Sequence, residues 1–246
     1  MTDARPDEFD RLESAADAIE SLMSLFASEE PLDEALNRVA SSGADAIADA
    51  DAVSISVLTD QAPRTVAYTD GQVLELDHVQ YSTGRGPCLD AAERRTPVRV
   101  GMDAMDERWP EFVVAARACG ISATLSVPLL VDRVDDDSEL VGSLNVYSRT
   151  ATAFDPFDET LMRLYMLSAG YAITSARRLQ RYREKVDQLR EALTSRSAID
   201  QAKGALRAIH GCSEDEAFQR LVTESQHNNV KLHNVARAFL ESLSKN

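Results

Sequence analysis

One long helical segment constrains the fold of this chain more than any other feature. From Asp158 to Ile209 the sequence contains no proline, and Gly170 and Gly204 are its only glycines. Asp155 or Asp158 can cap its beginning, because an aspartate side chain accepts hydrogen bonds from the free backbone N–H groups of a first turn. The segment therefore predicts a helix much longer than the average globular helix of about 10–14 residues.

Residues 175–195 of this segment carry a narrow apolar stripe between strongly charged faces. The apolar side chains recur in alternating steps of three and four, at the a and d positions of a two-stranded coiled coil. They are Leu179, Tyr182, Val186, Leu189 and Leu193. We expect this stripe to join two copies of the chain as a coiled-coil stalk. Packing of the stripe on the chain's own first domain is the alternative.

Charge is divided unevenly along the chain. The formal net charge is −15, which taken whole argues against a nucleic-acid-binding protein. Residues 1–158 hold 31 acidic and 12 basic side chains, whereas residues 159–246 hold 10 and 14. This asymmetry indicates two parts that face different partners.

Several classes of protein are excluded by simple patterns. The first ten residues are acidic and polar, unlike a signal peptide, and no apolar run reaches the roughly 18–20 residues that span a bilayer. Cys88, Cys119 and Cys212 form no CxxC pair, so we expect neither a disulfide framework nor a metal site. No nucleophile, base and orienting group can be recognised together. We therefore expect a cytoplasmic protein with no membrane partner, no catalytic residues and no enzymatic activity.

The first part of the chain predicts an α+β fold with a mostly antiparallel sheet and flanking helices. Helices are expected at residues 9–28, 32–48, 88–94 and 108–119, and strands at 53–58, 65–68, 97–100, 124–131 and 140–147. The acidic loop 132–139 is expected to connect the last two strands as a hairpin. The first helix has an apolar seam formed by Phe9, Leu12, Ala16, Ile19, Met23 and Phe26. The seam packs on its own domain or on a second copy, and the sequence leaves both open.

The last fifth of the chain predicts a small bundle of three helices. The first carries Ile199, Ala202 and Leu206 on one face and ends at Gly211, a residue type that favours the left-handed position after a helix. Ser213 and Glu216 have the spacing of a capping box, which begins the second helix. The third helix shows a full amphipathic stripe between residues 232 and 243.

A basic face lies opposite the apolar face of the first bundle helix. Arg196, Lys203 and Arg207 point within about 40° of one another at 100° per residue. Gly204 lies beside them, and a glycine inside a helix costs roughly 0.5–1 kcal/mol relative to alanine, which suggests close approach of another surface. These cations can grip phosphates and stack on splayed bases. A solvated basic face is the alternative.

The same residues carry a resemblance to the ANTAR domain. The segment Ser195-Arg196-Ser197-Ala198-Ile199-Asp200-Gln201-Ala202-Lys203-Gly204 is similar to the opening of that family, and the likeness extends over roughly residues 180–244. ANTAR domains are dimeric three-helix RNA-binding modules that bind paired hairpins in messenger leaders and prevent a terminator from forming. The resemblance implies RNA-binding roles for Arg196, Ala202, Lys203, Gly204, Asn229 and Lys231. Arg207 departs from the family pattern, and we interpret it as an additional phosphate contact.

The first part of the chain resembles GAF domains, which are small-molecule sensors. The likeness is carried by Gly84-Arg85-Gly86-Pro87-Cys88-Leu89-Asp90, by Arg108-Trp109-Pro110 and by Ser126-Val127-Pro128-Leu129. It implies a ligand pocket between sheet and helices, with Cys88 and Trp109 as candidate lining residues, but it names neither ligand nor cofactor. Cys88 follows Pro87, so it is either a reactive thiol at a helix N-terminus or a small buried residue. Trp109 is either a packing anchor or a stacking surface for the ligand.

These observations predict an N-terminal tail (1–14), a GAF-like sensory domain (15–174), a coiled-coil stalk (175–195) and an ANTAR-like RNA-binding domain (196–246). The predicted function is a signal-responsive dimeric antitermination regulator, with leader hairpins and a second copy of the chain as its partners. The alternative is a protein-interaction module whose helical bundle binds a partner protein.

Overall fold

The computed structural model of the chain describes residues 7–26, 30–58, 62–102, 108–131 and 140–244. It divides into two compact units, residues 1–180 and 181–246. Helix α6 (Pro156–His210) contributes residues to both units.

A five-stranded antiparallel sheet forms the centre of the first unit. Its strands are β1 (Ala52–Leu58), β2 (Arg64–Tyr68), β3 (Val98–Gly101), β4 (Ala123–Val131) and β5 (Leu140–Ser148). They lie in the order β2-β1-β5-β4-β3, and β4 pairs with β5 from Ala123↔Ser148 to Val131↔Leu140. The predicted antiparallel α+β fold is therefore confirmed. The expected hairpin loop, residues 132–139, lies outside the described residues.

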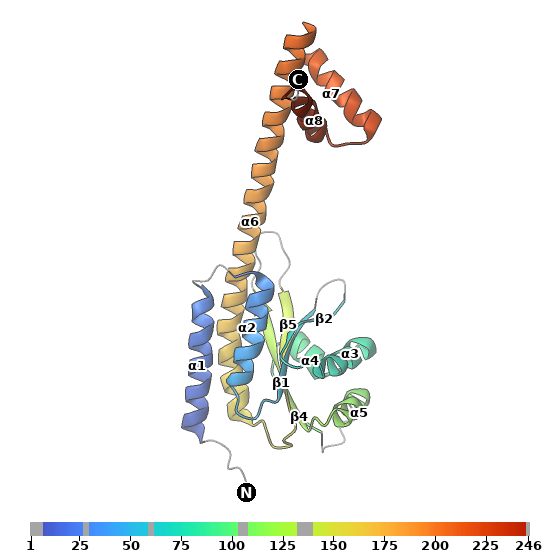
Figure 1. The fold of residues 1–246 in the computed structure, drawn as a ribbon. Coiled ribbons are helices and arrows are strands. Elements are labelled where there is room, and N and C mark those ends of the chain that lie inside the picture. The colour runs from blue at the N-terminus through green and yellow to red at the C-terminus, as the bar shows by residue number, and fades with distance from the viewer. Residues whose placement is uncertain (1–6, 27–29, 59–61, 103–107, 132–139, 245–246) are drawn as a thin grey trace. The chain divides into compact units, whose positions relative to one another are not determined.

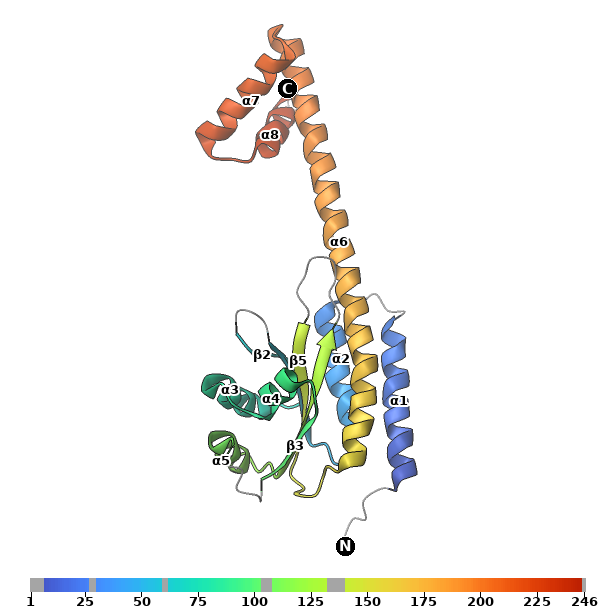
Figure 2. The same cartoon turned by 180° about the vertical axis from the view of Figure 1, so that it is seen from behind.

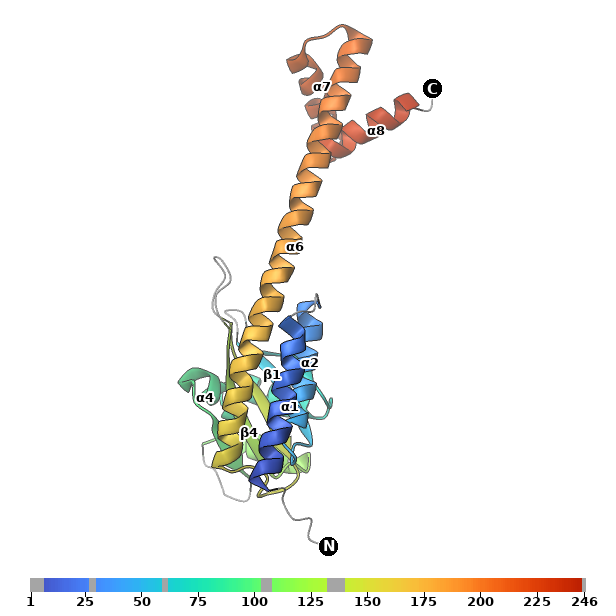
Figure 3. The ribbon, with the colours of Figure 1, turned by 90° about the vertical axis from the view of Figure 1, so that its left-hand side faces the viewer.

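One face of the sheet is apolar and is covered by α2 (Leu32–Asp45) and the first part of α6, and α1 (Glu8–Phe26) packs on these helices on the side away from the sheet (Figures 1 and 3). Side chains at alternate strand positions point into this layer and are buried. They include Val53, Ile55, Leu125, Val127, Leu144 and Val146. Tyr165 of α6 adds a buried hydrogen bond, because its hydroxyl donates to the Val39 carbonyl over 2.6 Å.

The opposite face of the sheet is covered by α3 (Val73–Thr83), α4 (Pro87–Arg94) and α5 (Pro110–Ala118), which Figure 2 shows from behind. Helices α4 and α5 match the helices predicted near 88–94 and 108–119. Helix α3 was not predicted. Its buried side is half polar, with Asp77 and Gln80 beside Val73 and Leu76, so its apolar residues do not recur at a helical period.

Helix α1 packs on the first unit through a face that the sequence pattern does not mark. It begins at Glu8, within the segment expected to be an N-terminal tail. Its buried residues are Arg11, Ala15, Ala18 and Leu22. In the apolar seam, Phe9, Leu12 and Met23 are exposed and Ile19 is half-buried, and the Phe26 side chain lies outside the described residues. The helix therefore packs on its own domain, as one of the two interpretations holds, but it does so through Ala15, Ala18 and Leu22 and only Ile19 of the seam.

The second unit is built from the last part of α6, α7 (Glu214–Asn228) and α8 (Leu232–Ser244). Their shared core consists of Ala198, Ala202, Leu206, Ala217, Leu221 and Ala236. Both hydrogen bonds of the predicted capping box are present, from the Glu216 N–H to Ser213 Oγ (3.2 Å) and from the Ser213 N–H to Glu216 Oε2 (2.8 Å). Gly211 has φ 63°, as expected for the residue that ends α6.

An ion-pair cluster joins α1 to the beginning of α6. The Arg11 guanidinium is 8% exposed and donates to both oxygens of Asp155, over 2.9 and 3.1 Å, and to Asp158. Asp155 also caps α6, because its Oδ1 accepts the N–H groups of Phe157 (2.8 Å) and Asp158 (3.0 Å). The hydrogen bond from Arg11 holds the pKa of Asp155 well below its usual range.

We expect Arg11→Met to lower the free energy of unfolding at pH 7 by about 2–3 kcal/mol. Removing one partner of a buried pair leaves an uncompensated charge, and the cost is at the lower end here because Asp155 is 33% exposed. A carboxyl whose folded pKa is depressed stabilises the protein above its unfolded pKa, and this contribution disappears as the pH falls through the folded value. The gap between wild type and variant should therefore narrow below about pH 4.

Urea denaturation of both proteins from pH 7 to pH 2.5 measures this gap. Arg38→Met removes the more exposed pair with Glu30 and should cost less than about 1 kcal/mol at every pH. If the difference in unfolding free energy between wild type and Arg11→Met stays constant on acidification, the stabilising role of the ion pair between Arg11 and Asp155 is contradicted.

Candidate functional sites

The three cations expected to form one basic face of α6 have different environments. Arg196 is 84% exposed, with its Nε 3.9 Å from Asp200 Oδ2. Lys203 is only 17% exposed, because its Nζ lies 2.6 Å from Glu214 Oε1 and 3.4 Å from Asp200 Oδ1. The hydrogen bond to Glu214 raises the pKa of Lys203. Lys203 therefore links α6 to the first turn of α7, and the exposed cations of this face are Arg196 and Arg207.

The two residues next to Lys203 in the sequence also differ from each other in exposure. Ala202 is fully buried in the core of the bundle, so its side chain packs α6 against the other helices and presents no surface to RNA. Gly204 is exposed, and a Cβ added there would meet no atom within 4 Å. Among the described residues of this unit, no neighbour requires a glycine at this position.

Asn229 and Lys231 lie in the connection between α7 and α8. Asn229 is the residue after α7 and has φ 52°, a left-handed conformation that asparagine adopts more readily than most residues. The Val230 N–H donates to the Ser225 carbonyl (3.0 Å) and the Ser225 hydroxyl donates to the Val230 carbonyl (2.6 Å), which fixes the turn. Lys231 is exposed beside it. Asn229 therefore shapes a turn that presents Lys231.

The apolar stripe expected to form a stalk is uncovered in the single chain. Leu179 is half-buried, and the other four residues, Tyr182, Val186, Leu189 and Leu193, are 46–65% exposed. The side chains around them are charged. This stretch of α6 thus has an apolar surface suited to another helix.

The first unit contains a buried polar layer between the sheet and helices α3 and α4. Alternate residues of three strands face it and are buried, namely Ser54, Ser56, Thr124, Ser126, Ser143, Asn145 and Tyr147. Asp77 of α3 accepts hydrogen bonds from the Tyr147 hydroxyl (2.6 Å) and the Thr65 hydroxyl (2.8 Å). Asn145 donates to Ser54 (3.1 Å) and Ser56 (2.9 Å).

Three atoms of this layer, among the residues that the structure describes, are buried without a hydrogen-bond partner. They are Gln80 Nε2, Ser143 Oγ and Asn145 Oδ1. The other end of the Gln80 amide accepts the Cys88 N–H (2.9 Å), and Gly86 is required beside it, because a Cβ there would lie 2.2 Å from Gln80 Oε1. Buried polar groups are rarely unpaired. The layer is therefore a candidate site for a small polar ligand. The alternating serines of β1 are the feature of the sequence that could have indicated it.

The two residues expected to line a ligand pocket do not lie in one cluster. Cys88 is buried beside the polar layer, and burial together with the nearby Asp77 raises the pKa of its thiol. Its burial favours the second interpretation, a small buried residue, because desolvation disfavours the thiolate. Trp109 belongs to an apolar cluster with Phe112 and Val113, and the Arg108 guanidinium stacks 4.2 Å from its ring.

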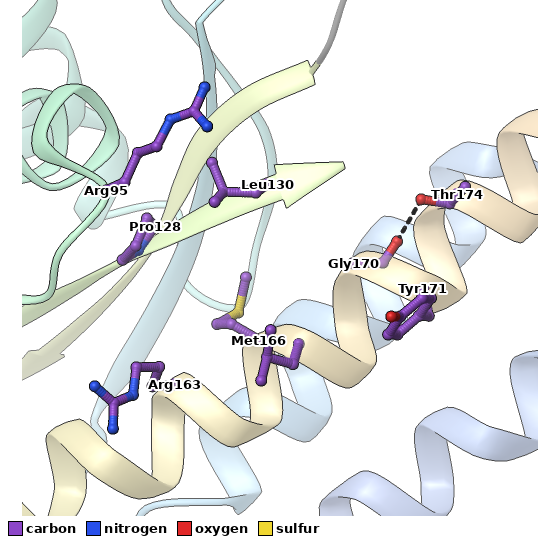
Figure 4. Close-up of a pocket in the computed structure, with 9 residues that line it drawn as sticks. Arg95, Pro128, Leu130, Arg163, Met166, Gly170, Tyr171 and Thr174 are labelled. Atoms are coloured by element: carbon purple, nitrogen blue, oxygen red, sulfur yellow. Dashed lines mark hydrogen bonds between the residues drawn. The ribbon is translucent and has the colours of Figure 1, made fainter. Parts of the chain in front are cut away.

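A hollow of the first unit lies between β4 and α6 (Figure 4). Arg95, from the end of α4, and Arg163, from α6, flank an apolar floor that includes Leu130 and Met166, in a cavity of about 330 Å³. The helix passes close to the strand here, because a Cβ on Gly170 would lie 2.8 Å from the Leu130 carbonyl oxygen.

The part of the chain that the structure describes contains no cluster of three or more histidine, cysteine or acidic side chains placed to hold a metal ion. None of its helices is both long and apolar enough to cross a bilayer.

Comparison with known proteins divides the chain near the boundary between the two compact units, at residues 180 and 181. A family model described as a GAF domain matches residues 29–174, and one described as an ANTAR domain matches residues 187–240. No curated protein matches the chain. Among solved structures, the GAF domain of an Acinetobacter phosphoenolpyruvate-protein phosphotransferase is 18% identical, with a TM-score of 0.49, and the match covers 68% of this chain and 97% of that one. Free methionine-R-sulfoxide reductase from Neisseria meningitidis is 17% identical, with a TM-score of 0.46 and coverages of 66% and 92%.

We expect Asp77→Asn to stabilise the first unit increasingly as the pH rises from 4 to 8. Burial raises the pKa of Asp77, so its contribution is fully present below the unfolded pKa and is lost as the pH rises through the folded one. Asparagine has no proton to lose, so the difference in unfolding free energy should grow by at most about 1.4 kcal/mol per pH unit.

Urea denaturation of the full chain at several pH values measures this difference. Glu75→Gln changes an exposed carboxyl on the same helix and should show no such pH dependence. A difference between Asp77→Asn and wild type that is independent of pH would show that Asp77 is ionised in the folded protein.

Proposed function

Because the chain belongs to the GAF domain family through residues 29–174 and carries an ANTAR domain at residues 187–240, it is a signal-sensing regulator, and we propose that it binds paired hairpins in messenger RNA leaders and prevents transcription termination. Cytoplasmic action on nascent transcripts is part of this proposal. The observation that carries it is the exposed face of α6 with Arg196 and Arg207 around an open Gly204, in the unit that matches the ANTAR model.

The charges of this face support contact with a polyanion. Arg196 and Arg207 are exposed, and guanidinium groups bind phosphates and stack on unpaired bases. Lys203 contributes mainly by fixing α7 against α6 through Glu214, and Lys231 adds a cation at the turn between α7 and α8. We assign direct RNA contact to Arg196, Gly204, Arg207 and Lys231, and positioning roles to Ala202, Lys203 and Asn229.

The uncovered stripe of residues 182–193 supports a homodimer. Two such stripes can bury each other as a parallel coiled coil, and the charged flanks remain in water. A dimer carries two RNA-binding units, so binding of one hairpin raises the effective concentration of the second. We propose that this arrangement underlies recognition of paired rather than single hairpins.

The buried polar layer supports a sensory role for the first unit. Its unpaired amide and hydroxyl groups suit a small polar ligand, whose binding would change the packing of α3 and α4 on the sheet. A regulatory rather than catalytic role is supported by Cys88, because a buried thiol with a raised pKa is a poor nucleophile.

We expect the double variant Arg196→Ala, Arg207→Ala to weaken binding of a two-hairpin leader RNA at least about tenfold at low salt. Loss of two phosphate contacts should also lower the slope of log affinity against log salt by about 2. The matched control Arg64→Ala, Arg163→Ala removes two exposed cations of the first unit and should leave both values unchanged. Filter binding at several salt concentrations measures them. Unchanged RNA binding by the first variant would favour the alternative, a partner protein on the bundle.

We expect Val186→Glu, Leu189→Glu to convert a dimer into a monomer. Four like charges would meet at the centre of a two-stranded seam, where burying each unpaired charge is costly. Light scattering of the full chain at tens of micromolar should give twice the chain mass for wild type and a single chain mass for the variant. Lys185→Glu, Arg190→Glu changes the flanks and should remain dimeric. A monomeric wild type would overturn the stalk.

A further inference from the structure

A groove of about 580 Å³ lies between α7 and α8, outside the basic face already described. Its lining residues are Leu206, Arg220, Leu221, Glu224, Asn228, Val230, Asn234, Val235, Ala238 and Phe239. The turn that presents Lys231 borders it, because Val230 is one of the lining residues. The groove therefore lies beside a residue to which we assign RNA contact.

The floor of the groove is apolar. Leu206 and Leu221 are buried beneath it, and Val235 and Phe239 are half-buried. Its volume falls within the roughly 300–1,000 Å³ of small-molecule sites. An unstacked nucleobase is a flat apolar ring system that proteins hold against aromatic and aliphatic side chains. Size and floor therefore fit a single base.

The rim of the groove is polar and rich in hydrogen-bond acceptors. Asn228 Nδ2 donates to Glu224 Oε1 (2.6 Å), which orients the carboxylate. Among the described residues, no side chain or backbone group is hydrogen-bonded to Glu224 Oε2, to Asn228 Oδ1 or to the side-chain amide of Asn234. The rim thus offers two free acceptors and one amide to whatever occupies the groove.

The rim favours a base over a phosphate, and it favours some bases over others. A carboxylate repels phosphate, so Glu224 disfavours the RNA backbone in the groove, whereas Arg220 and Lys231 offer cations at its edges. Adenine, cytosine and guanine each present an exocyclic amino group that donates to such acceptors. Uracil has no amino group. Its one donor on the base-pairing edge, N3–H, lies between two carbonyl oxygens that would face acceptors.

We propose that the groove between α7 and α8 takes one unstacked, amino-bearing base from a single-stranded RNA loop, with the adjoining phosphates at Lys231 and Arg220. The inference rests on the proposed RNA-binding function and adds a sequence-reading site to it. An apolar side chain of a partner protein is the other conceivable occupant, but it would cover Glu224 and Asn234 without pairing them, which is costly.

The test uses the full-length chain and a library of hairpin RNAs with one constant stem and a randomised loop. Bound RNAs are sequenced, and each loop position of the best binder is then replaced by uridine. We expect one position at which uridine weakens binding about tenfold or more, the discrimination typical of a well-paired base contact. Glu224→Gln, which replaces an acceptor by a mixed group, should reduce this discrimination.

A second variant fills the groove. Ala238 is exposed in the groove wall, so Ala238→Trp should fold normally while its ring occupies the site. It should abolish discrimination at the identified position but retain the salt-dependent binding that Arg196 and Arg207 provide. Circular dichroism and thermal melting confirm folding.

Two control variants separate this effect from general ones. Asp215→Asn removes an exposed carboxylate of α7 outside the groove and should change affinity equally for all loops. Thr223→Trp adds a ring on an exposed position of α7 outside the lining and should leave discrimination unchanged.

The outcomes separate the two proposals. Loop discrimination that survives in both Glu224→Gln and Ala238→Trp overturns the base site and leaves RNA binding intact. Salt-dependent binding with no loop preference in wild type also overturns the base site alone. Absence of hairpin binding by wild type overturns the proposed function, and this inference with it.

Discussion

Helix α6 imposes the constraint on which both units depend, because one uninterrupted helix supplies three different surfaces. In the first unit it buries Met162, Tyr165, Ala169 and Ile173 against the apolar face of the sheet. In the second it buries Ala198, Ala202 and Leu206 in the bundle core. Between them, residues 182–190 are all exposed. A helix with two cores and a bare middle leaves its apolar stripe uncovered, which is why we propose a second copy of the chain as its partner.

The two faces of the sheet in the first unit differ in chemistry, and we propose that one provides stability and the other sensing. The apolar face, packed by α2 and α6, supplies the hydrophobic core, and the Arg11 cluster holds α1 against α6. The opposite face consists of buried serine, threonine, asparagine and tyrosine side chains under α3 and α4. A buried polar network that is incompletely paired is destabilising, since its groups have lost water without full compensation. Its retention beneath two short helices is physically reasonable in a domain that gains stability when a polar ligand pairs those groups.

Most of the fold could be predicted from local sequence patterns. The features that could not be predicted depend on tertiary packing. The long helix, the strands β4 and β5 and the Ser213–Glu216 capping box follow from periodicity and cap chemistry over a few residues. Helix α3 was not predicted because the polar residues Asp77 and Gln80 lie on its buried side, so its apolar residues do not recur at a helical period. The seam of α1 gave the wrong packing face, because a buried arginine and small alanines fill the contact with the domain. Lys203 lies on the predicted face, but its pairing with Glu214 required the position of α7.

Net charge is a poor guide to nucleic-acid binding in this chain, since the placement of each acid matters more than the sum. The acidic excess lies in residues 1–158, while the last part is only slightly basic. Within that part, Asp200 and Glu214 engage Lys203, which reduces the local positive field but holds α6 and α7 in register. Glu224, in the groove between α7 and α8, lowers electrostatic affinity for phosphate at a position suited to accept from a base. Phosphate contacts provide most of the affinity, and base contacts provide the sequence specificity. An acidic side chain that weakens binding to phosphate can therefore form a specific contact with a base.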